Sequence, residues 1–551
     1  MDFSIEVSHH RAAMDVARRL LHQLSQSPPA DRAALRRLKA AVAAETKTAL
    51  ARNDRLLAQY RQELAEGARR PNRQLERLLT LNGIRSHSGV ATVTVITEPY
   101  ACPGRCVYCP TEARAPKSYL TNEPAVRRAI RNAYDPYRQV ASRLEALVQT
   151  GHPIDKIELI VKGGTWSFYP LAYQETFVRR CVEAANAFGD AATASNQPPT
   201  TIQPETLGAV ERTLRENERA RCRIIGITVE TRPDYIDIAE VRRLRSLGVT
   251  RVELGVQILD DGILALVVRD HGTAEVRQAT RQLKDAGFKV AYHLMPNLPG
   301  ATPEQDLASA RALFEDPAYQ PDTLKLYPCV VVESAELFQW WQAGRYRPYP
   351  DEVLIALLLQ IKQLVPPHVR IERIIRDIPS TSIQGGCRVT NLRETLQRQL
   401  RARGLRCRCI RCRQVREDAA GTFQLVRRQY AASGGVEVFL SFEDPSTDRL
   451  ASLLRLRLPE AEAPTAFPAL QGAALIRELH SYGQHVPLQA RATDAVQHQG
   501  LGRRLVAEAE RIAREEFGRT RIVVIAGVGA REYYRHLGYT LEETYMIKRL
   551  A

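Results

Sequence analysis

Three cysteines fall within one short stretch of the sequence, ACPGRCVYCP, at Cys102, Cys106 and Cys109. A structural zinc site takes four ligands, and a 4Fe-4S cluster normally takes four thiolates. Three thiolates on such a cluster would leave one iron free to bind a small molecule. The alternative is a zinc loop that takes its fourth ligand from elsewhere in the chain.

The cysteine loop directly follows a β-rich run, and runs of this kind recur along the next part of the chain. They alternate with helical stretches, a pattern that predicts βαβ units and a parallel sheet. Six or seven such units would build a complete or partial barrel, in which functional residues lie at the carboxyl ends of the strands. The runs are 90–96, 156–161, 224–229, 251–256, 289–294, 323–328 and, as a seventh candidate, 369–375.

The C-x3-C-x2-C spacing, with Tyr108 before the last cysteine, resembles that of the radical S-adenosylmethionine (SAM) enzymes. In that family the open iron of a 4Fe-4S cluster chelates SAM, and one electron cleaves SAM to a 5′-deoxyadenosyl radical. Glycine pairs are commonly plain turns and a glutamate at a strand end is often a surface charge, yet several such residues follow predicted strands here. The resemblance makes them SAM contacts: Gly163, Gly164 and Thr165 in KGGT, Glu230 in ETRPD, and Gln257 in ELGVQ.

The pattern of predicted secondary structure changes at about residue 420. From there, strands linked by turns precede a helix at 500–517 and a strand at 521–527. This pattern predicts a compact α+β domain. The stretch QHQGLGRRL at 497–505 fits a Q/R-x-x-G-x-G/A turn that opens a helix. Free backbone N–H groups and the helix dipole at such a turn can hold a pyrophosphate.

Together with GAREYYRHLGY at 529–539, this region resembles a GCN5-related acetyltransferase domain. In that family the glycine turn binds the pyrophosphate of acetyl-CoA. Tyr533 and Tyr534 fall where such enzymes often carry a tyrosine near the thioester. Core packing on a short helix is the alternative and should apply to at least one of them.

The composition describes a basic chain of 551 residues with 78 Lys and Arg against 62 Asp and Glu, a formal charge of +16. That length predicts two or three domains, and the charge favours a polyanion such as nucleic acid, although solubility alone would also explain it. The densest apolar run, 353–359, is too short to span a membrane, and the first residues lack a signal-peptide pattern. We therefore expect a cytoplasmic protein with reduced cysteines.

Residues 1 to about 80 show apolar residues at three- and four-residue spacing and many arginines, which predicts helices. A solvated helical bundle and an arm that grips phosphate are equally good interpretations.

A radical SAM barrel joined to an acetyltransferase domain, with RELHSYG at 477–483 and LSFEDP at 440–445, closely resembles the family of Elongator catalytic subunits, which modify uridine 34 of tRNA. The resemblance covers about 85–550. It implies an α/β fold: a partial TIM-type βα barrel, then an α+β acetyltransferase domain, preceded by a helical extension. The expected domains are a basic tRNA-binding region (1–84), the radical SAM domain (85–384), a zinc-binding connector (385–419) and the acetyltransferase domain (420–551).

The resemblance also assigns functions to particular residues. The cysteines of the opening loop would hold the cluster, and the sequence CRCIRC resembles a zinc site of prokaryotic-type members. Catalytic candidates are Tyr533 and Tyr534. Expected acetyl-CoA contacts are Lys162, Glu478, Leu479, His480, Ser481, Leu501, Gly502, Arg503 and Tyr534, and expected zinc ligands are Cys407, Cys409 and Cys412, with Cys387 as candidate fourth. If Lys162 meets acetyl-CoA, the two domains must face one another across a shared cleft.

The implied reaction uses SAM-derived radical chemistry and acetyl-CoA to install a carboxymethyl group on C5 of the wobble uridine. It needs a 4Fe-4S cluster, SAM, acetyl-CoA, zinc, an electron donor and the anticodon stem-loop of a tRNA; the chain would act alone or as a homodimer. The first rival is a protein lysine acetyltransferase with a structural barrel, and the second is a non-catalytic RNA-binding scaffold. Neither rival requires the intact C-x3-C-x2-C motif.

Overall fold

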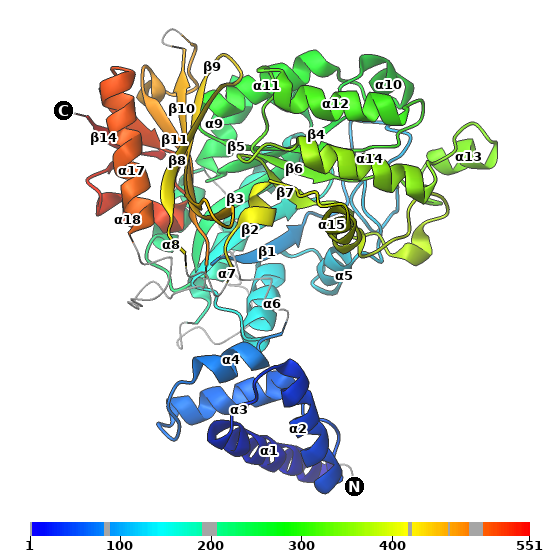
Figure 1. The fold of residues 1–551 in the computed structure, drawn as a ribbon, viewed down its shortest axis with the longest axis vertical. Coiled ribbons are helices and arrows are strands. Elements are labelled where there is room, and N and C mark those ends of the chain that lie inside the picture. The colour runs from blue at the N-terminus through cyan, green and yellow to red at the C-terminus, as the bar shows by residue number, and fades with distance from the viewer. Residues whose placement is uncertain are drawn as a thin grey trace.

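A computed structural model of the chain describes residues 3–81, 89–189, 207–416, 421–460, 463–483 and 500–550. Within these residues the chain forms an N-terminal group of helices, a parallel seven-stranded sheet and a second, mixed seven-stranded sheet (Figure 1). Among the helices of the described residues, none combines the length and the apolar character needed to cross a lipid bilayer.

The parallel sheet has its seven strands in sequence order, so that the first and last strands lie at its two edges. It is therefore a partial barrel, as expected, and each of the seven β-rich runs is one of its strands. Both faces of the strands are covered, and β4 is buried along all but its last residue. The strands are β1 (Ala91–Ile96), β2 (Lys156–Lys162), β3 (Arg223–Thr231), β4 (Arg251–Gln257), β5 (Lys289–Leu294), β6 (Thr323–Leu326) and β7 (Arg370–Arg373).

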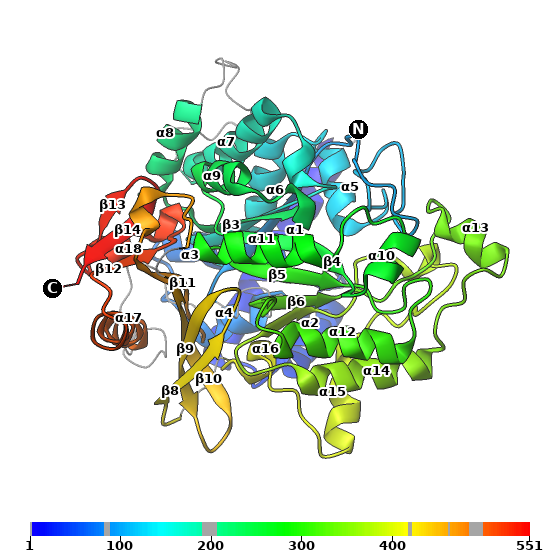
Figure 2. The ribbon, with the colours of Figure 1, turned by 90° about the horizontal axis from the view of Figure 1, so that it is seen from above.

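Most of the helices in this part of the chain lie on the outside of the sheet (Figure 1, Figure 2). Side-chain caps fix several of their starts: Asp135 accepts from the backbone of the first turn of α6, and Thr302 does the same for α12. The helices are α5 (Pro124–Arg131), α6 (Pro136–Gln149), α7 (Leu171–Ala187), α8 (Leu207–Asn217), α9 (Ile238–Ser246), α10 (Asp261–Leu266), α11 (Thr273–Asp285), α12 (Pro303–Glu315), α13 (Leu337–Gln342), α14 (Asp351–Leu364), α15 (Leu392–Ala402) and α16 (Ile410–Arg413).

The second sheet has the strand order β13-β14-β12-β11-β10-β9-β8, with β11 and β12 parallel and the other pairs antiparallel. It confirms the α+β expectation for the C-terminal region. The edge strand β8 was not anticipated from the sequence. The elements are β8 (Gln424–Ala431), β9 (Gly435–Asp444), β10 (Arg449–Pro459), β11 (Ala474–Ser481), α17 (Leu501–Arg511), β12 (Arg521–Val524), α18 (Arg531–Arg535), β13 (Thr540–Glu542) and β14 (Tyr545–Arg549).

The N-terminal helices form a small bundle with its own apolar core, set against one end of α6 (Figure 1). Arg61 donates to the carbonyl of Val148 at 2.7 Å, and the backbone of Leu81 donates to Thr150 at 3.0 Å. The expected helical extension is thus present. Its helices are α1 (Phe3–Gln26), α2 (Arg32–Glu45), α3 (Asn53–Ala65) and α4 (Arg73–Leu79).

The C-terminal sheet docks against the amino ends of the barrel strands. Arg477 of β11 forms a buried ion pair with Asp322, which directly precedes β6, at 2.5 Å. Gly527 lies so close to β3 that a Cβ there would stand 2.1 Å from the carbonyl oxygen of Ile225. Because the carboxyl ends of the strands point the other way, the C-terminal sheet sits at the opposite end of the barrel from the cysteine loop.

Candidate active site

A cavity of about 370 Å³ opens at the carboxyl ends of the parallel strands. It continues between the strands as far as Thr92, the second residue of β1, so it enters the lumen, the space that the strands enclose. Most of the residues predicted for the cluster and for SAM line it, as expected for strand-end positions. They are Cys102, Cys106, Cys109, Gly164, Thr165, Glu230 and Gln257.

The three cysteine sulfurs are free thiols that face this cavity, and only Cys106 is buried. A hydrogen bond with Cys109 lowers the pKa of Cys106 to about 5, helped by the charge of Arg269 and opposed by burial. The Sγ of Cys102 lies 3.8 Å from the hydroxyl of Thr165. Thiolate character at one cysteine suits metal binding, because the thiolate is the ligand form.

Arg269 is a residue of this site that the sequence interpretation missed. It donates to the Sγ of Cys106 at 3.4 Å and to the carbonyl of Gly255 at 2.6 Å, and its Nε donates to His271 at 2.9 Å. A Cβ on Gly255 would stand 2.6 Å from the guanidinium, so only glycine admits this approach. No sequence signal distinguished Arg269 from the surrounding charged residues.

The two glycines of KGGT have different environments. Gly163 has φ 133° and a Cβ there would overlap the hydroxyl of Thr97 at 1.9 Å, so packing between strand ends requires glycine. Gly164 has φ 61°, lines the cavity, and would meet nothing closer than the Tyr169 hydroxyl at 3.9 Å. Of the pair, Gly164 is therefore the one that leaves room for a ligand.

Glu230 and Gln257 both present acceptor oxygens at strand ends. Glu230 accepts from the Tyr119 hydroxyl at 2.9 Å. Gln257 has φ 72°, a left-handed backbone, and its buried Oε1 has no hydrogen-bond partner among the described residues. A buried acceptor left open in this way fits a ligand that brings its own donors, such as the hydroxyls of a ribose.

Deeper in the lumen lies a group of buried charges. Lys162 is 3.8 Å from carboxylate oxygens of both Glu230 and Glu253, and Lys325 forms an ion pair with Glu253. His293 contacts the same two carboxylates. Of this group, only Lys162 and Glu230 were expected from the sequence. A signal was available, since a charged residue within a strand buried on both faces, as in RVELGV, KVAYHL and TLKLYP, is unusual.

A second group of predicted residues meets where β11 ends and α17 begins. A Cβ on Gly502 would lie 3.1 Å from the hydroxyl of Tyr533 and 3.9 Å from that of Ser481 and from Leu479. Gly500 starts the helix with φ 72°, and Arg503 is exposed on its first turn. The QHQ portion of the turn motif, at 497–499, lies outside the described residues. This exposed helix start can attract an anion through its backbone N–H groups.

Other predicted contacts of the C-terminal domain are committed to internal packing. Glu478 accepts from Lys289 and from Arg455, each at 2.8 Å. These cations hold the pKa of Glu478 below its usual range, although burial would raise it. The ring of His480 packs on that of Tyr482 at 4.3 Å. The carboxylate of Glu478 is thus a structural anion in this fold.

The two adjacent tyrosines separate clearly by burial. Tyr534 is 6% exposed and packs in the core of the C-terminal domain, whereas Tyr533 is 36% exposed. Burial raises the pKa of both hydroxyls. Tyr533 is the one that stands beside Gly502 at the start of α17, while Tyr534 occupies the core-packing role expected for one of the pair.

The structure does not bring Lys162 to this second group. Lys162 lines the barrel cavity, and no residue beyond 420 lines that cavity among those described. The two predicted sites therefore lie at different ends of the barrel, and the shared open cleft expected from a Lys162 contact is not seen there.

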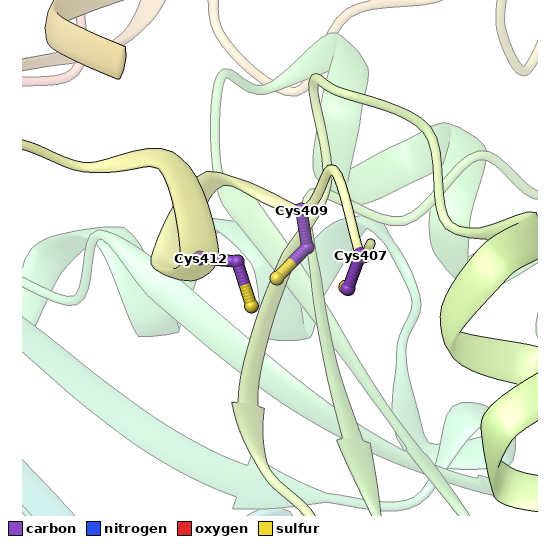
Figure 3. A group of neighbouring side chains, drawn as sticks. All are labelled: Cys407, Cys409 and Cys412. Atoms are coloured by element: carbon purple, nitrogen blue, oxygen red, sulfur yellow. The ribbon is translucent and has the colours of Figure 1, made fainter. Parts of the chain in front are cut away.

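The cysteines of CRCIRC form a compact group where the chain enters α16 (Figure 3). The sulfurs of Cys407, Cys409 and Cys412 lie within 4.8 Å of one another. Such spacing suits a single ion, because sulfurs about 2.3 Å from a common zinc lie about 3.8 Å apart. Cys387 is not part of this group; its thiol is buried beside Asp351 at the start of α14.

Comparison with known proteins adds to this geometry. The family model described as "Radical SAM superfamily" matches residues 99–313, and the one described as "Radical_SAM C-terminal domain" matches 321–402. A protein of Dehalococcoides mccartyi named "tRNA uridine(34) acetyltransferase" is 47% identical over 473 residues, covering 85% of this chain and 99% of the relative. "Elongator complex protein 3" of Danio rerio is 40% identical over 486 residues, covering 85% of each chain.

A solved structure has the same fold over most of its length. The "archaeal Methanocaldococcus infernus Elp3 with N-terminus deletion (1-46)" is 39% identical, with a TM-score of 0.71, and covers 84% of this chain and 100% of that chain.

The half-open parallel barrel, the three-cysteine loop and the family match define a radical SAM enzyme. Such a domain implies a 4Fe-4S cluster and SAM, and the open cavity, the three facing thiols and the unsatisfied Gln257 acceptor fit both. More particularly, the chain belongs to the family of tRNA uridine(34) acetyltransferases, which includes Elongator complex protein 3.

Proposed function

We propose that this protein uses SAM-derived radical chemistry and acetyl-CoA to install a carboxymethyl group on C5 of the wobble uridine of tRNA. The observation that carries the proposal is the gathering of three cysteines and several predicted SAM contacts around one cavity, in a chain whose relatives are named for uridine 34. Neither C5 of uridine nor an acetyl methyl group is activated toward ordinary acid–base chemistry, so a radical is needed.

Within this cavity Cys102, Cys106 and Cys109 would hold the cluster. With a cluster and SAM bound there, the site would supply a radical able to take hydrogen from the acetyl methyl group. The chain's own contribution is to orient SAM, with Gly164 and Thr165 at its methionine end and the acceptors of Glu230 and Gln257 at its ribose. The deep, largely buried walls of the cavity keep water from the radical.

Acetyl-CoA would bind at the start of α17, with its pyrophosphate on the backbone of Leu501, Gly502 and Arg503. Leu479, Ser481 and the exposed Tyr533 surround that helix start, which supports a role for them beside the acyl arm. Glu478, whose carboxylate is taken by two cations, would contribute backbone only. Contacts of Lys162, His480 and Tyr534 with acetyl-CoA stay predictions of the family resemblance.

Cys407, Cys409 and Cys412 would bind one zinc ion and so fasten the connector to the barrel. The spacing of their sulfurs supports a single ion. Cys387 as fourth ligand finds no support in its position beside Asp351. Thiolates also suit an iron–sulfur centre, and metal analysis of the isolated protein distinguishes the two.

The tRNA would contact the basic surfaces, including the N-terminal helices, through its anticodon stem. The domain limits proposed for this assignment are those of the sequence analysis: 1–84, 85–384, 385–419 and 420–551. An electron donor is required, and the chain would act alone or as a homodimer. Affinity for tRNA should fall steeply with salt, because phosphate contacts release counterions.

The alternative of a protein lysine acetyltransferase is not favoured. That reaction needs a free base beside the thioester, and the carboxylate of Glu478, on the strand beside the helix start, is held by Lys289 and Arg455. The relatives are named for tRNA uridine, and the radical SAM match covers the barrel.

Transcripts that differ only at the wobble base test the substrate. We expect SAM- and acetyl-CoA-dependent modification of a tRNA with U34 and none of its C34 variant. Equal modification of both, or acetylation of protein lysines in place of tRNA, would contradict the proposal.

A further inference from the structure

The barrel lumen of this protein is charged where such lumens are usually filled by apolar side chains. Glu253 on β4 and Lys325 on β6 are 0% and 2% exposed, and His293 on β5 is 4% exposed. His293 and Lys325 nevertheless line the cavity that the cysteines face. Buried charges are retained at a cost, so a group of them in the wall of the reaction cavity calls for a function.

The contacts of His293 indicate which of its two ring nitrogens carries the proton. Its Nε2 lies 3.0 Å from a carboxylate oxygen of Glu253, and its Nδ1 lies 3.5 Å from one of Glu230. A carboxylate only accepts, and a neutral imidazole has one N–H. The shorter contact therefore assigns the N–H to Nε2, which leaves Nδ1 as an unprotonated nitrogen beside Glu230.

The surroundings of His293 keep Glu253 ionised and the imidazole neutral, so that Nδ1 can accept a proton. Glu253 stays ionised: burial would raise its pKa, but Lys325, Lys162 and Arg251 hold it well below its usual range. Burial lowers the pKa of His293, and the charge of Lys325 lowers it further, whereas Glu230 and Glu253 raise it. The net effect is a lowered pKa, so the ring is neutral near pH 7. The ring of Tyr327 packs against it edge-on, with centroids 5.3 Å apart. A proton arriving at Nδ1 would be stabilised by Glu230.

Glu230, Glu253 and His293 place their ligand atoms within 4.8 Å of one another and so resemble a metal site. Two cations already occupy the space between the carboxylates: Lys162 lies 3.8 Å from each, and Lys325 is paired with Glu253. A divalent ion would be repelled by both ammonium groups. The charge balance of the group therefore favours proton chemistry over metal binding.

We propose that His293, oriented by Glu253, is the base that removes the C5 proton of the target uridine. This inference rests on the proposed function. Once the carboxymethyl carbon has bonded to C5, the ring radical must lose one electron and the C5–H proton to restore the C5=C6 double bond. The electron goes to a one-electron acceptor of the iron–sulfur class, and the proton goes to Nδ1 of His293.

The test compares two products of the same anaerobic reaction, 5′-deoxyadenosine and modified uridine. His293→Gln keeps a donor where Nε2 meets Glu253 but removes the basic nitrogen. We expect 5′-deoxyadenosine to form at a rate within about threefold of the wild type. Modified uridine per 5′-deoxyadenosine should fall on the order of 100-fold, the usual effect of losing a general base. With C5-deuterated uridine, the variant but not the wild type should then show a primary isotope effect.

Two further variants make the result specific. Tyr292→Phe changes the neighbouring residue of β5, whose hydroxyl bonds Thr280 on the other side of the strand, and should leave both products unchanged. His293→Ala with added imidazole should recover modified uridine without altering 5′-deoxyadenosine. Equal loss of both products in His293→Gln, or an unchanged product ratio, would overturn the proposal. A wild type that makes 5′-deoxyadenosine but never modifies tRNA would instead sink the proposed function.

Discussion

The Nζ of Lys289, at the first residue of β5, lies 2.8 Å from the carboxylate of Glu478 on β11. This contact joins the amino end of the barrel to the C-terminal sheet. The cysteine loop lies at the carboxyl ends of the same strands, so the lumen separates the two proposed cofactor sites. A group that moves from the proposed acetyl-CoA site to the proposed SAM site must therefore pass through or around the barrel. The shortest such path crosses the charged lumen.

Breaking the ion pairs between the two sheets should destabilise the whole protein. Arg477 is 3% exposed and holds Asp322 and Glu437, and Arg477→Met would leave both carboxylates buried without this partner. We expect the free energy of unfolding to fall by about 3–5 kcal/mol in denaturant titrations. Arg311→Ala, which removes an exposed pair with Glu315, should change it by less than about 1 kcal/mol. Equal losses of stability in Arg477→Met and Arg311→Ala would contradict a structural role for Arg477.

Cluster binding should depend on the loop cysteines and not on cysteine content. Cys106→Ala should lose most of the iron and the visible absorbance after anaerobic reconstitution, because it removes one of three ligands. Cys181→Ala is the matched control, since Cys181 is buried in α7 away from the cavity. It should keep its iron and lose only packing energy. Iron loss in both variants would mean that folding, not ligation, controls the cluster.

The glycines at 163 and 164 should respond differently to alanine. Gly163→Ala should lower the free energy of unfolding by about 1–3 kcal/mol, because its Cβ meets Thr97 at 1.9 Å. Gly164→Ala meets no close atom and should lower it by about 1 kcal/mol, the effect of its positive φ. SAM affinity, measured by calorimetry on the reconstituted protein, should weaken in Gly164→Ala. Unchanged SAM affinity there would separate this turn from the SAM site.

Acid should weaken the link between the connector and the C-terminal sheet. Glu443 accepts from Arg413, Arg428 and Ser441, and these bonds lower its pKa to about 2 although burial opposes them. A depressed folded-state pKa gives stability that is present above the ordinary value near 4.5 and is lost as the pH falls toward 2. At pH 6 the free energy of unfolding of the wild type should therefore exceed that of Glu443→Gln by about 1–2 kcal/mol. Denaturant titrations at pH 6 and pH 3 should show that margin shrinking, and a constant margin would contradict it.

Sequence patterns predicted the barrel well because its strands are rich in Ile, Leu and Val, as in KIELIV and RVELGV, and alternate with helical stretches. The edge strand β8 was missed because its sequence, QLVRRQYA, has two adjacent arginines in place of an apolar run, and five of its eight residues are exposed. His293 and Lys325 were missed for the opposite reason. Each sits in a mostly apolar run, which predicts a strand but does not by itself indicate that a polar side chain within the run lines a cavity.

The positions of side chains between distant elements could not be predicted. Cys387 is twenty residues before Cys407 and was a reasonable fourth ligand by spacing, but the fold buries it beside Asp351. Lys162 directly precedes the glycine pair, yet no pattern indicated that it would lie between Glu230 and Glu253. Such contacts depend on strand register, which appears only when the sheet is assembled.

The most direct test of the central claim is the fate of the acetyl methyl carbon. The reconstituted protein is given SAM, a reductant, tRNA and acetyl-CoA labelled on its methyl group under anaerobic conditions, and the digested tRNA is analysed. We predict labelled carboxymethyluridine with the wild type and none with Cys106→Ala. Label on protein lysines, unaffected by Cys106→Ala, would contradict the account.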